Sequence, residues 1–372
     1  MLRRRMLIIG VQTIMRIHEV LAAESIATAG TKVIDLNLSD LVSRITICVK
    51  GTNNNAVPTA HPAEIVSKIE LVDGSDVLFS LSGKEAQALN FYETGEMPTV
   101  NLEFRNAVMC FAAFHINLGR FLWDPKLALD PARFSNLQLK ITHNKAAGGS
   151  TPSAGELAVF AELMDKTEAS PTGFLMAKEI QSYGLVSSAH EYITLPTDYM
   201  YRKLMIKSLF SGKQPWEQYN KVKLSIDNDR VVLLNNLRTT DLLKFMSVKK
   251  DFVEFIMGTG TGSAADVYCT PAMDIACAQG TLEAALSAAN VIKQAYGGVI
   301  NILSESAKGY QLIVTGKCPH GALDIPFGDQ MNPDSWLKMD KVGNLKFDIT
   351  AGSSVGASST CEIVSQQLRA YK

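Results

Sequence analysis

The glycine-rich stretch IMGTGTGSAADVY, residues 256–268, is the most obvious candidate for chemistry, because glycine-rich turns can cradle phosphate groups. Its glycines are Gly258, Gly260 and Gly262, whereas a dinucleotide-binding fingerprint would need glycine at position 263, which is Ser263. No lysine follows where a phosphate-binding P-loop requires one. The spacing therefore favours a flexible loop at the tip of a domain over a nucleotide site.

Carboxylates and histidines are the next candidates for catalysis or metal binding. A glycoside hydrolase needs two carboxyls that face one cleft. The aspartates cluster instead in predicted turns, where they stabilise local backbone hydrogen bonds, at positions 124, 130, 324, 329, 334 and 340. The six histidines are scattered singly, without the HxH or HExxH spacing of metal sites, and there is no GxSxG nucleophile motif. We therefore predict no catalytic residue, no cofactor and no metal, and a surface or interface role for His115.

Composition restricts the class of protein. The chain has 372 residues, which suits two domains better than one. Its 36 Lys and Arg residues against 37 Asp and Glu residues give a net charge of −1, which does not support a specific nucleic-acid surface. The six cysteines include no CxxC pair, and we interpret them as reduced, buried thiols.

Most of the chain alternates apolar and polar residues with a period of two, which is typical of strands with one buried face. The alternation is clear at residues 34–38, 45–49, 77–81 and 137–141. Turn-forming segments such as KGTNNN and HNKAAGGSTPSAG separate these runs. The pattern predicts an all-β protein made of antiparallel sandwiches.

Helix signals are few. The alanine-rich segment at 281–298 predicts a helix that ends at Gly297 in a left-handed cap. Residues 170–184 predict a short helix or part of a linker, which we place at 166–190.

The amino terminus begins MLRRRMLIIGVQTIMRIHEVLAAE, with three arginines and apolar residues at the helical positions 7, 11, 14 and 21. Gln12, Arg16 and Glu19 disfavour a spanning helix, and the short apolar run disfavours a secretory signal. We predict a basic amphipathic helix within residues 1–30. It would contact a membrane surface or a neighbouring subunit, or else cover the core of its own domain.

The chain repeats itself. FHINLGRFLWDPKLALDPARFSNLQLKIT, residues 114–142, resembles LDIPFGDQMNPDSWLKMDKVGNLKFDIT, residues 323–350, at an offset of 209 residues that becomes 208 after the loop. Each segment reads as a strand, a glycine turn, a loop with a tryptophan and an asparagine-led strand. Glu156 aligns with Glu362 further on, and residues 68–81 resemble residues 221–234 upstream. Asp40 and Arg44 likewise align with Asp198 and Arg202. Four similarities in the same order predict a tandem duplication.

Each half is long enough for an eight-stranded jelly roll. We predict a first jelly roll at 31–165 and a second at 191–372, with an insertion at about 247–300 in the second. Trp123 and Trp336 lie in equivalent loops and would either anchor those loops or bury against a partner. Two equivalent arginines would pair with a neighbouring aspartate or with another subunit, namely Arg44 beside Asp40 and Arg202 beside Asp198.

The repeated segments and the ending SQQLRAYK resemble the double jelly-roll major capsid proteins of tailless icosahedral DNA viruses and phages. The resemblance covers roughly residues 31–372. It implies a non-enzymatic homotrimer that packs against neighbouring capsomers and other capsid proteins such as a penton. The protein would be made in the host cytoplasm and located in the virion, with its amino-terminal segment against an internal membrane. The alternative from the residues is a carbohydrate-binding or glycan-hydrolysing double β-sandwich protein.

Overall fold

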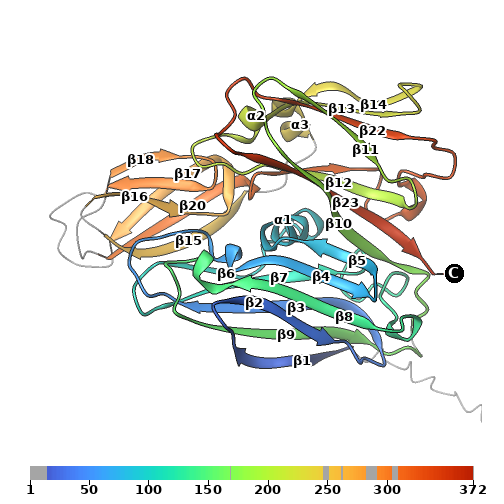
Figure 1. Cartoon of the computed structure of the whole chain (residues 1–372), viewed down its shortest axis with the longest axis horizontal. Helices are drawn as coiled ribbons and strands as arrows, with labels where there is room; N and C mark the ends of the chain where they lie inside the picture. Colours follow the sequence, from blue (N-terminus) through green and yellow to red (C-terminus); the bar gives the residue numbers. More distant parts are fainter. Residues whose placement is uncertain are drawn as a thin grey trace, which may run out of the picture.

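The protein is described by a computed structural model that covers residues 15–167, 169–245, 251–260, 263–281, 291–303 and 309–371. Two β-sandwiches lie side by side, and a third, smaller β region projects from one side (Figure 1). Each sandwich buries its own apolar core, and a third core fills the projecting region. The prediction of an all-β double jelly roll is confirmed.

The first sandwich contains eight strands in two layers. One layer has the order β1-β9-β3-β7 and the other has the order β2-β8-β4-β5. Their bounds are Met15–Ser25 for β1, Ala29–Asp35 for β2, Leu41–Thr52 for β3, Val66–Asp73 for β4, Asp76–Leu81 for β5, Met109–Asn117 for β7, Leu137–Asn144 for β8 and Ala154–Met164 for β9. Alternating residues of β3 and β8 are buried, as the period-two pattern predicted.

The second sandwich repeats this arrangement with the orders β10-β23-β12-β21 and β11-β22-β13-β14. Its strands are β10 (Gly173–Gly184), β11 (His190–Leu195), β12 (Met200–Lys207), β13 (Tyr219–Ile226), β14 (Val231–Arg238), β21 (Ala322–Pro326), β22 (Leu345–Ala351) and β23 (Thr360–Ala370). Each strand has a counterpart in the first sandwich. Strands β10 to β14 correspond in order to β1 to β5, and strands β21 to β23 correspond to β7 to β9. The repeated segments of the sequence therefore occupy equivalent strands.

Backbone pairing joins the two sandwiches within the chain. Strand β5 of the first sandwich pairs in parallel with β10 of the second, at Phe79 with Ala177 and Ser80 with Lys178. An eight-stranded sheet therefore runs from one sandwich into the other. This strand-to-strand contact fixes how the two halves meet.

The projecting region is an insertion between β14 and β21. It contains β15 (Phe252–Thr259), β16 (Ala264–Tyr268), β17 (Pro271–Thr281), β18 (Val291–Ala295), β19 (Val299–Leu303) and β20 (Gly309–Pro319). Strand β15 pairs in parallel with β6 (Val100–Glu103), which extends the first sheet into the insertion. The insertion therefore ends near Pro319, beyond the predicted limit at 300.

Helices are short, and the first one positions the contact between the sandwiches. Helix α1 (Gly83–Thr94) begins at Ser82, whose hydroxyl accepts from the Glu85 backbone while the Glu85 carboxylate accepts from Ser82 in return. It ends at Gly95, whose φ of 81° is a left-handed conformation that glycine adopts readily. The other helices are α2 (Pro215–Gln218) and α3 (Thr239–Phe245), with 3-10 turns at Pro62–Ile65, Pro131–Arg133, Lys145–Ala147 and Pro333–Ser335.

Three predicted elements are wrong in the described residues. The amino-terminal helix is wrong over Met15–Ser25, which is strand β1 paired with β9, and residues 1–14 lie outside the described part. The linker at 166–190 is wrong because Gly173–Gly184 is strand β10 paired with β23. The helix at 281–298 is wrong over Val291–Ala295, which is strand β18, and residues 282–290 are not described. In each case pairing with another strand outweighs the local sequence preference.

The positions of these strands also differ from the predicted domain limits. The first sandwich begins at Met15 rather than residue 31, and the second begins at Gly173 rather than residue 191. No helix in the described ranges is long and apolar enough to cross a membrane.

Candidate functional site

Helix α1 lies between the two sandwiches and carries the groups that join them (Figure 1). The Tyr92 hydroxyl donates to the carbonyl of Ala322 in β21 at 2.7 Å. The Tyr92 carbonyl accepts from the ammonium group of Lys203 in β12 at 3.2 Å. The helix of the first half is therefore hydrogen-bonded to two strands of the second.

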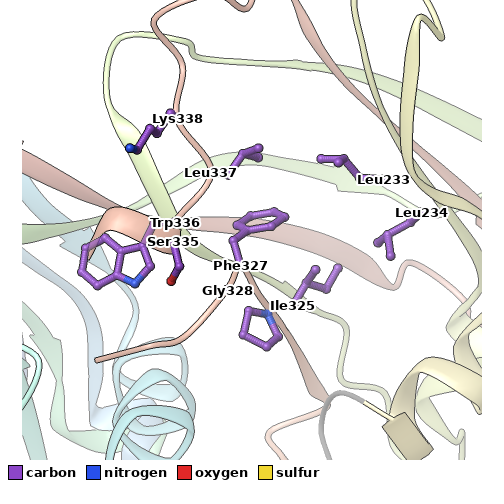
Figure 2. A pocket seen from close by; sticks show the side chains of 10 residues that line it. Leu233, Leu234, Ile325, Phe327, Gly328, Ser335, Trp336, Leu337 and Lys338 are labelled. Atoms are coloured by element: carbon purple, nitrogen blue, oxygen red, sulfur yellow. The ribbon is translucent and has the colours of Figure 1, made fainter. Parts of the chain in front are cut away.

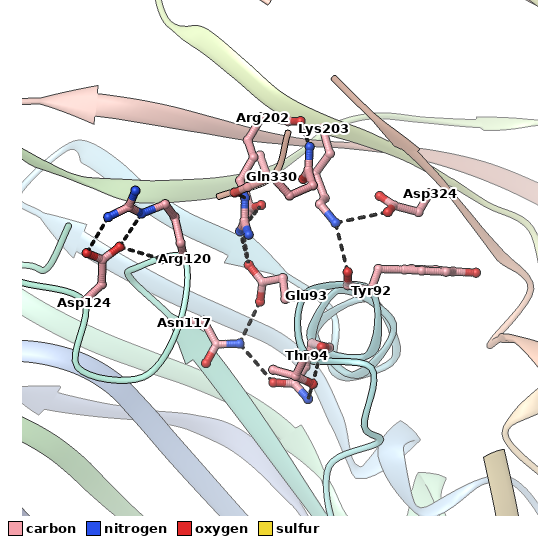
Figure 3. A network of polar contacts seen from close by, with 12 residues as sticks. Tyr92, Glu93, Thr94, Asn117, Arg120, Asp124, Arg202, Lys203, Asp324 and Gln330 are labelled. Carbon is pink, nitrogen blue, oxygen red and sulfur yellow. Dashed lines mark hydrogen bonds and ion pairs between the residues drawn. The ribbon is translucent and has the colours of Figure 1, made fainter. Parts of the chain in front are cut away.

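A buried ion pair continues this contact (Figure 3). The guanidinium of Arg202 lies 3.3 Å from the Glu93 carboxylate and donates to the Gln366 side chain at 3.1 Å. Asn117 donates to the other Glu93 oxygen at 2.7 Å. Because Arg202 and Glu93 are almost fully buried, the carboxylate depends on these donors for the hydrogen bonds it would make in water.

Lys203 is the second buried cation of this network. Its ammonium group lies 3.0 Å from the Asp324 carboxylate, on the neighbouring strand β21. Burial lowers the pKa of Lys203, and the charge of Asp324 opposes that change. The predicted role of Asp324 as a turn residue is therefore wrong, since it lies within a strand and balances a buried charge.

The repeated loops also contact each other. Arg120 forms an ion pair with Asp124 at 2.6 Å and donates to the carbonyl of Met331 in the equivalent loop of the second half, also at 2.6 Å. Trp336 is buried beside Leu127 and Leu175, and its indole N–H donates to the Asp329 carbonyl at 2.8 Å. Trp336 therefore anchors its loop.

Two buried histidines lie where the first sandwich meets the insertion. The rings of His61 and His320 are 4.8 Å apart, centroid to centroid, in an edge-to-face arrangement. His61 Nδ1 accepts from the Ala63 backbone at 3.0 Å, and His61 Nε2 lies 2.9 Å from the Thr270 hydroxyl. Burial, with the charge of nearby Lys84, lowers the pKa of His61 to about 3, and burial lowers the pKa of His320 as well.

A polar pocket of about 330 Å³ lies between the sandwiches. Its walls include Lys207, which forms an ion pair with Glu362 at 3.2 Å, and Glu179 of β10. Burial and the neighbouring carboxylates Glu85 and Glu362 raise the pKa of Glu179 to about 7. This pocket therefore places a carboxyl that titrates near neutral pH at the contact between the halves.

An open apolar groove of about 450 Å³ lies on the second sandwich (Figure 2). Strand β14 forms one wall, and the end of β21 with its following loop forms the other. The lining residues are Leu233, Leu234, Ile325, Pro326, Phe327, Gly328, Ser335, Trp336, Leu337 and Lys338.

The structure corrects the predicted arginine pairs. Arg44 contacts Glu162 at 2.7 Å rather than Asp40, which pairs with Arg16. Arg202 contacts Glu93 rather than Asp198. The sequence neighbours are the wrong partners because Glu162 lies beside Arg44 on the paired strand β9, and packing of helix α1 against the second sandwich brings Glu93 to Arg202.

The remaining candidate residues from the sequence are His115, Trp123 and Gly258. His115 is partly buried in β7 and lies 3.0 Å from the Thr46 hydroxyl on β3. Trp123 is partly buried beside a small apolar cluster. Gly258 lies within strand β15 rather than in a loop, and a Cβ there would lie 2.2 Å from the Tyr310 hydroxyl oxygen.

Three of the buried carboxylates and one surface groove bear on what the described residues can bind. The buried carboxylates Glu93, Asp124 and Asp324 are each paired with a cation instead of facing a cleft. Within the described part, no three His, Cys, Asp or Glu side chains are grouped to hold a metal ion. The six cysteines are free thiols. The surface instead presents an apolar groove beside an open strand edge, which suits binding of another chain.

Comparison with known proteins supports the fold at low sequence identity. No protein-family model and no curated protein sequence matches the chain. The major capsid protein of bacteriophage PM2 is similar in structure, with a TM-score of 0.54 and 11% identity over 96% of this chain and 98% of that one.

Two further solved structures show the same similarity. For Sulfolobus Turreted Icosahedral Virus the TM-score is 0.57 at 12% identity, over 96% of this chain and 92% of that one. For the PBCV-1 virus capsid it is 0.55 at 9% identity, over 99% and 95%. The chain thus has the double jelly-roll fold of these viral capsid proteins.

Proposed function

We propose that this protein is the major capsid protein of an icosahedral virus, and that it acts as a structural subunit without catalytic activity. The observation that carries the proposal is the complete double jelly roll, which is shared with viral capsid proteins over nearly the whole chain. The protein is accordingly located in the virion after synthesis in the host cytoplasm.

The native unit is a homotrimer. Two similar sandwiches in each of three chains place six similar bodies around a closed threefold axis, which gives a nearly hexagonal outline. The buried network of Arg202, Glu93 and Lys203 supports this role, since it holds the two sandwiches of one chain in a fixed relation. Trimers then pack against neighbouring capsomers and against other capsid proteins such as a penton.

The amino-terminal segment contacts an internal membrane. Its residues before Met15 include three consecutive arginines, Arg3, Arg4 and Arg5, followed by the apolar run MLIIG. Cationic and apolar groups together favour the surface of an anionic bilayer. A chain that lacks residues 1–14 should still form trimers but should lose binding to vesicles that contain anionic lipid.

The experiment that tests the main proposal measures the assembly state of the full chain. Size-exclusion chromatography with light scattering should give a single species of three chains, and electron microscopy should show a nearly hexagonal outline. A monodisperse monomer at high protein concentration would contradict the trimer. Hydrolysis of a glycan panel by the purified protein would favour the carbohydrate-active alternative.

A further inference from the structure

The two halves of the chain differ at one edge. Strand β5 of the first sandwich is covered by β10, so Leu78 is only 1% exposed. Strand β14 is its counterpart and ends its sheet. Leu234 pairs with Leu224 as Phe79 pairs with Leu71, so in the strand register Leu233 corresponds to Leu78, and it is 37% exposed. Val231, Val232 and Leu237 of β14 are also exposed. An apolar edge strand of this kind readily pairs with another strand.

The strand that would complete this edge has an exposed counterpart in the same chain. Strand β10 corresponds to β1, because each pairs with the last strand of its own sandwich. Ile17 pairs with Glu162, and Leu175 pairs with Leu368. Since Glu156 aligns with Glu362, Glu162 aligns with Leu368, and Leu175 of β10 therefore corresponds to Ile17 of β1. Leu175 is 1% exposed, whereas Ile17 is 70% exposed. Strand β1 also ends its sheet, so its outer edge is open among the described residues.

The groove is lined by residues equivalent to those that receive β10 in the first half. The Leu175 amide donates to the Leu118 carbonyl at 2.9 Å, and the Ala128 amide donates to the Gly173 carbonyl at 3.0 Å. At the offsets of the repeat, 209 and then 208, Leu118 corresponds to Phe327 and Ala128 to Trp336. Both of these residues line the groove (Figure 2). In the second half the Phe327 carbonyl accepts from the Gln330 side chain and the Trp336 amide donates to the Pro333 carbonyl, both at 3.2 Å, and an added strand would replace these contacts.

We propose that β14 and the groove bind strand β1 of a second copy of this chain, in parallel, as β5 binds β10 within the chain. Ile17 of one copy then enters the groove of the next, and Glu19 lies beside Leu234, as Ala177 lies beside Phe79. The contact is head-to-tail, and three such contacts close a ring. This inference rests on the proposed trimer and identifies the surfaces that form it.

Lysine substitutions on the two surfaces test the proposal. In the full chain, Ile17→Lys and Leu233→Lys should each raise the dissociation constant of the trimer at least a hundredfold, measured by light scattering over a dilution series. Both side chains are exposed in the monomer, so circular dichroism and the midpoint of denaturant unfolding should stay unchanged when compared as monomers. The matched control is Val186→Lys, since Val186 is 66% exposed and lies on neither surface; it should leave the trimer intact.

Cross-linking gives an independent measurement. A chain with both Glu19→Cys and Asn235→Cys should form, with a short bismaleimide, covalent species of two and three chains and no larger ones. The wild type, with its native cysteines, should remain uncross-linked. A pair of Glu19→Cys and Val186→Cys should behave like the wild type.

The outcomes separate this inference from the proposed function. A wild-type monomer would overturn both the trimer and this contact. A wild-type trimer that survives both lysine substitutions would overturn only the contact. Cross-links that form solely within one chain would show that β1 reaches β14 of its own copy, and they too would overturn it.

Discussion

Acid should weaken the folded chain through the histidine pair beneath the insertion. His61 Nδ1 accepts a hydrogen bond from the Ala63 backbone, so protonation of that nitrogen would break the contact. His320 Nε2 faces the Gln87 side-chain oxygen at 2.9 Å, while the amide nitrogen of Gln87 donates to the Ala113 carbonyl. Both rings are buried near the charge of Lys84, and Lys207 adds a second charge near His320, so the fold favours neutral imidazoles.

The size of the effect follows from the pKa values. The pKa of His61 is about 3 in the folded chain and about 6.5 when unfolded. Because the folded value is the lower one, stability is full above pH 6.5 and is lost as the pH falls towards 3. At pH 5.0 His61 costs about 2 kcal/mol relative to pH 7.5, from about 1.36 kcal/mol per pH unit, and His320 acts in the same direction.

Glu254 changes the pH dependence of stability in the opposite direction, so its contribution must be separated from that of the histidines. Burial raises its pKa to about 7. A carboxyl with a raised pKa retains its proton in the folded chain, so it makes the fold relatively more stable as the pH falls from 7 towards 4.5. The test therefore compares variants, because the total pH dependence of the wild type contains both contributions.

The assay measures the free energy of unfolding by denaturant titration at pH 7.5 and pH 5.0. His320→Asn is suitable because His320 has a φ of 53°, a left-handed conformation that asparagine tolerates. On acidification the variant should lose less stability than the wild type, because it lacks one imidazole that the fold keeps neutral. The control His18→Asn changes an exposed histidine outside this pair, and when both proteins are compared as monomers it should behave as the wild type. Equal losses in the wild type and in His320→Asn would refute this reasoning.

Three further predictions concern single side chains. Arg202→Ala should lower the free energy of unfolding by about 3 kcal/mol, since it leaves Glu93 buried without its cation, and Arg202→Met with Glu93→Leu should recover much of that loss in the same titration. Glu179→Gln should stabilise the protein at pH 8 by about 1 kcal/mol, a value reduced to allow for solvent screening of a partly exposed group. At pH 4 the same substitution should have no effect on stability. Equal effects at pH 8 and pH 4 would contradict the raised pKa of Glu179. Gly258→Ala should destabilise the insertion by about 2 kcal/mol, because the added methyl group would clash with Tyr310. Hydrogen exchange should then show faster exchange of the β15 and β20 amides, and slower exchange would contradict the prediction.

The strands that the sequence predicted share one property. Residues 45–49 in β3 and 137–141 in β8 alternate strictly, because each strand has one face on the core and one face outside it. The internal repeat predicted the topology, since segments that recur in the same order are expected to form equivalent strands in the two sandwiches. Local pattern and internal similarity together were enough for the double jelly roll.

The elements that were missed lack that alternation. Strand β10, GFLMAKEIQSYG, begins with five buried residues in succession, because one of its faces meets the first sandwich and the other meets the second. Strand β1, MRIHEVLAAES, is mostly exposed. Neither strand has the period-two signature of a half-buried sheet, so the sequence alone suggested a helix or a linker.

The polar contacts between the halves have no local sequence signal. Arg202 and Glu93 are 109 residues apart, and His61 and Thr270 are 209 residues apart. Their side chains meet only because β5 pairs with β10 and because the insertion returns to the first sandwich through β6 and β15. An arginine next to an aspartate in the sequence, such as Arg44 near Asp40, was therefore a poor guide to its partner.

The difference between the halves has a physical reason once assembly is considered. Within the chain, β10 is always available to cover β5, so apolar residues such as Phe174 and Met176 can enter the first core permanently. Strand β1 would meet β14 only in an assembled trimer, so it must remain soluble beforehand. Arg16 and His18 alternate with the exposed Met15 and Ile17, Glu19 follows them, and this polarity keeps the free edge compatible with water. The first strand of the repeat should therefore be more polar than its counterpart, which is the difference the two sequences show.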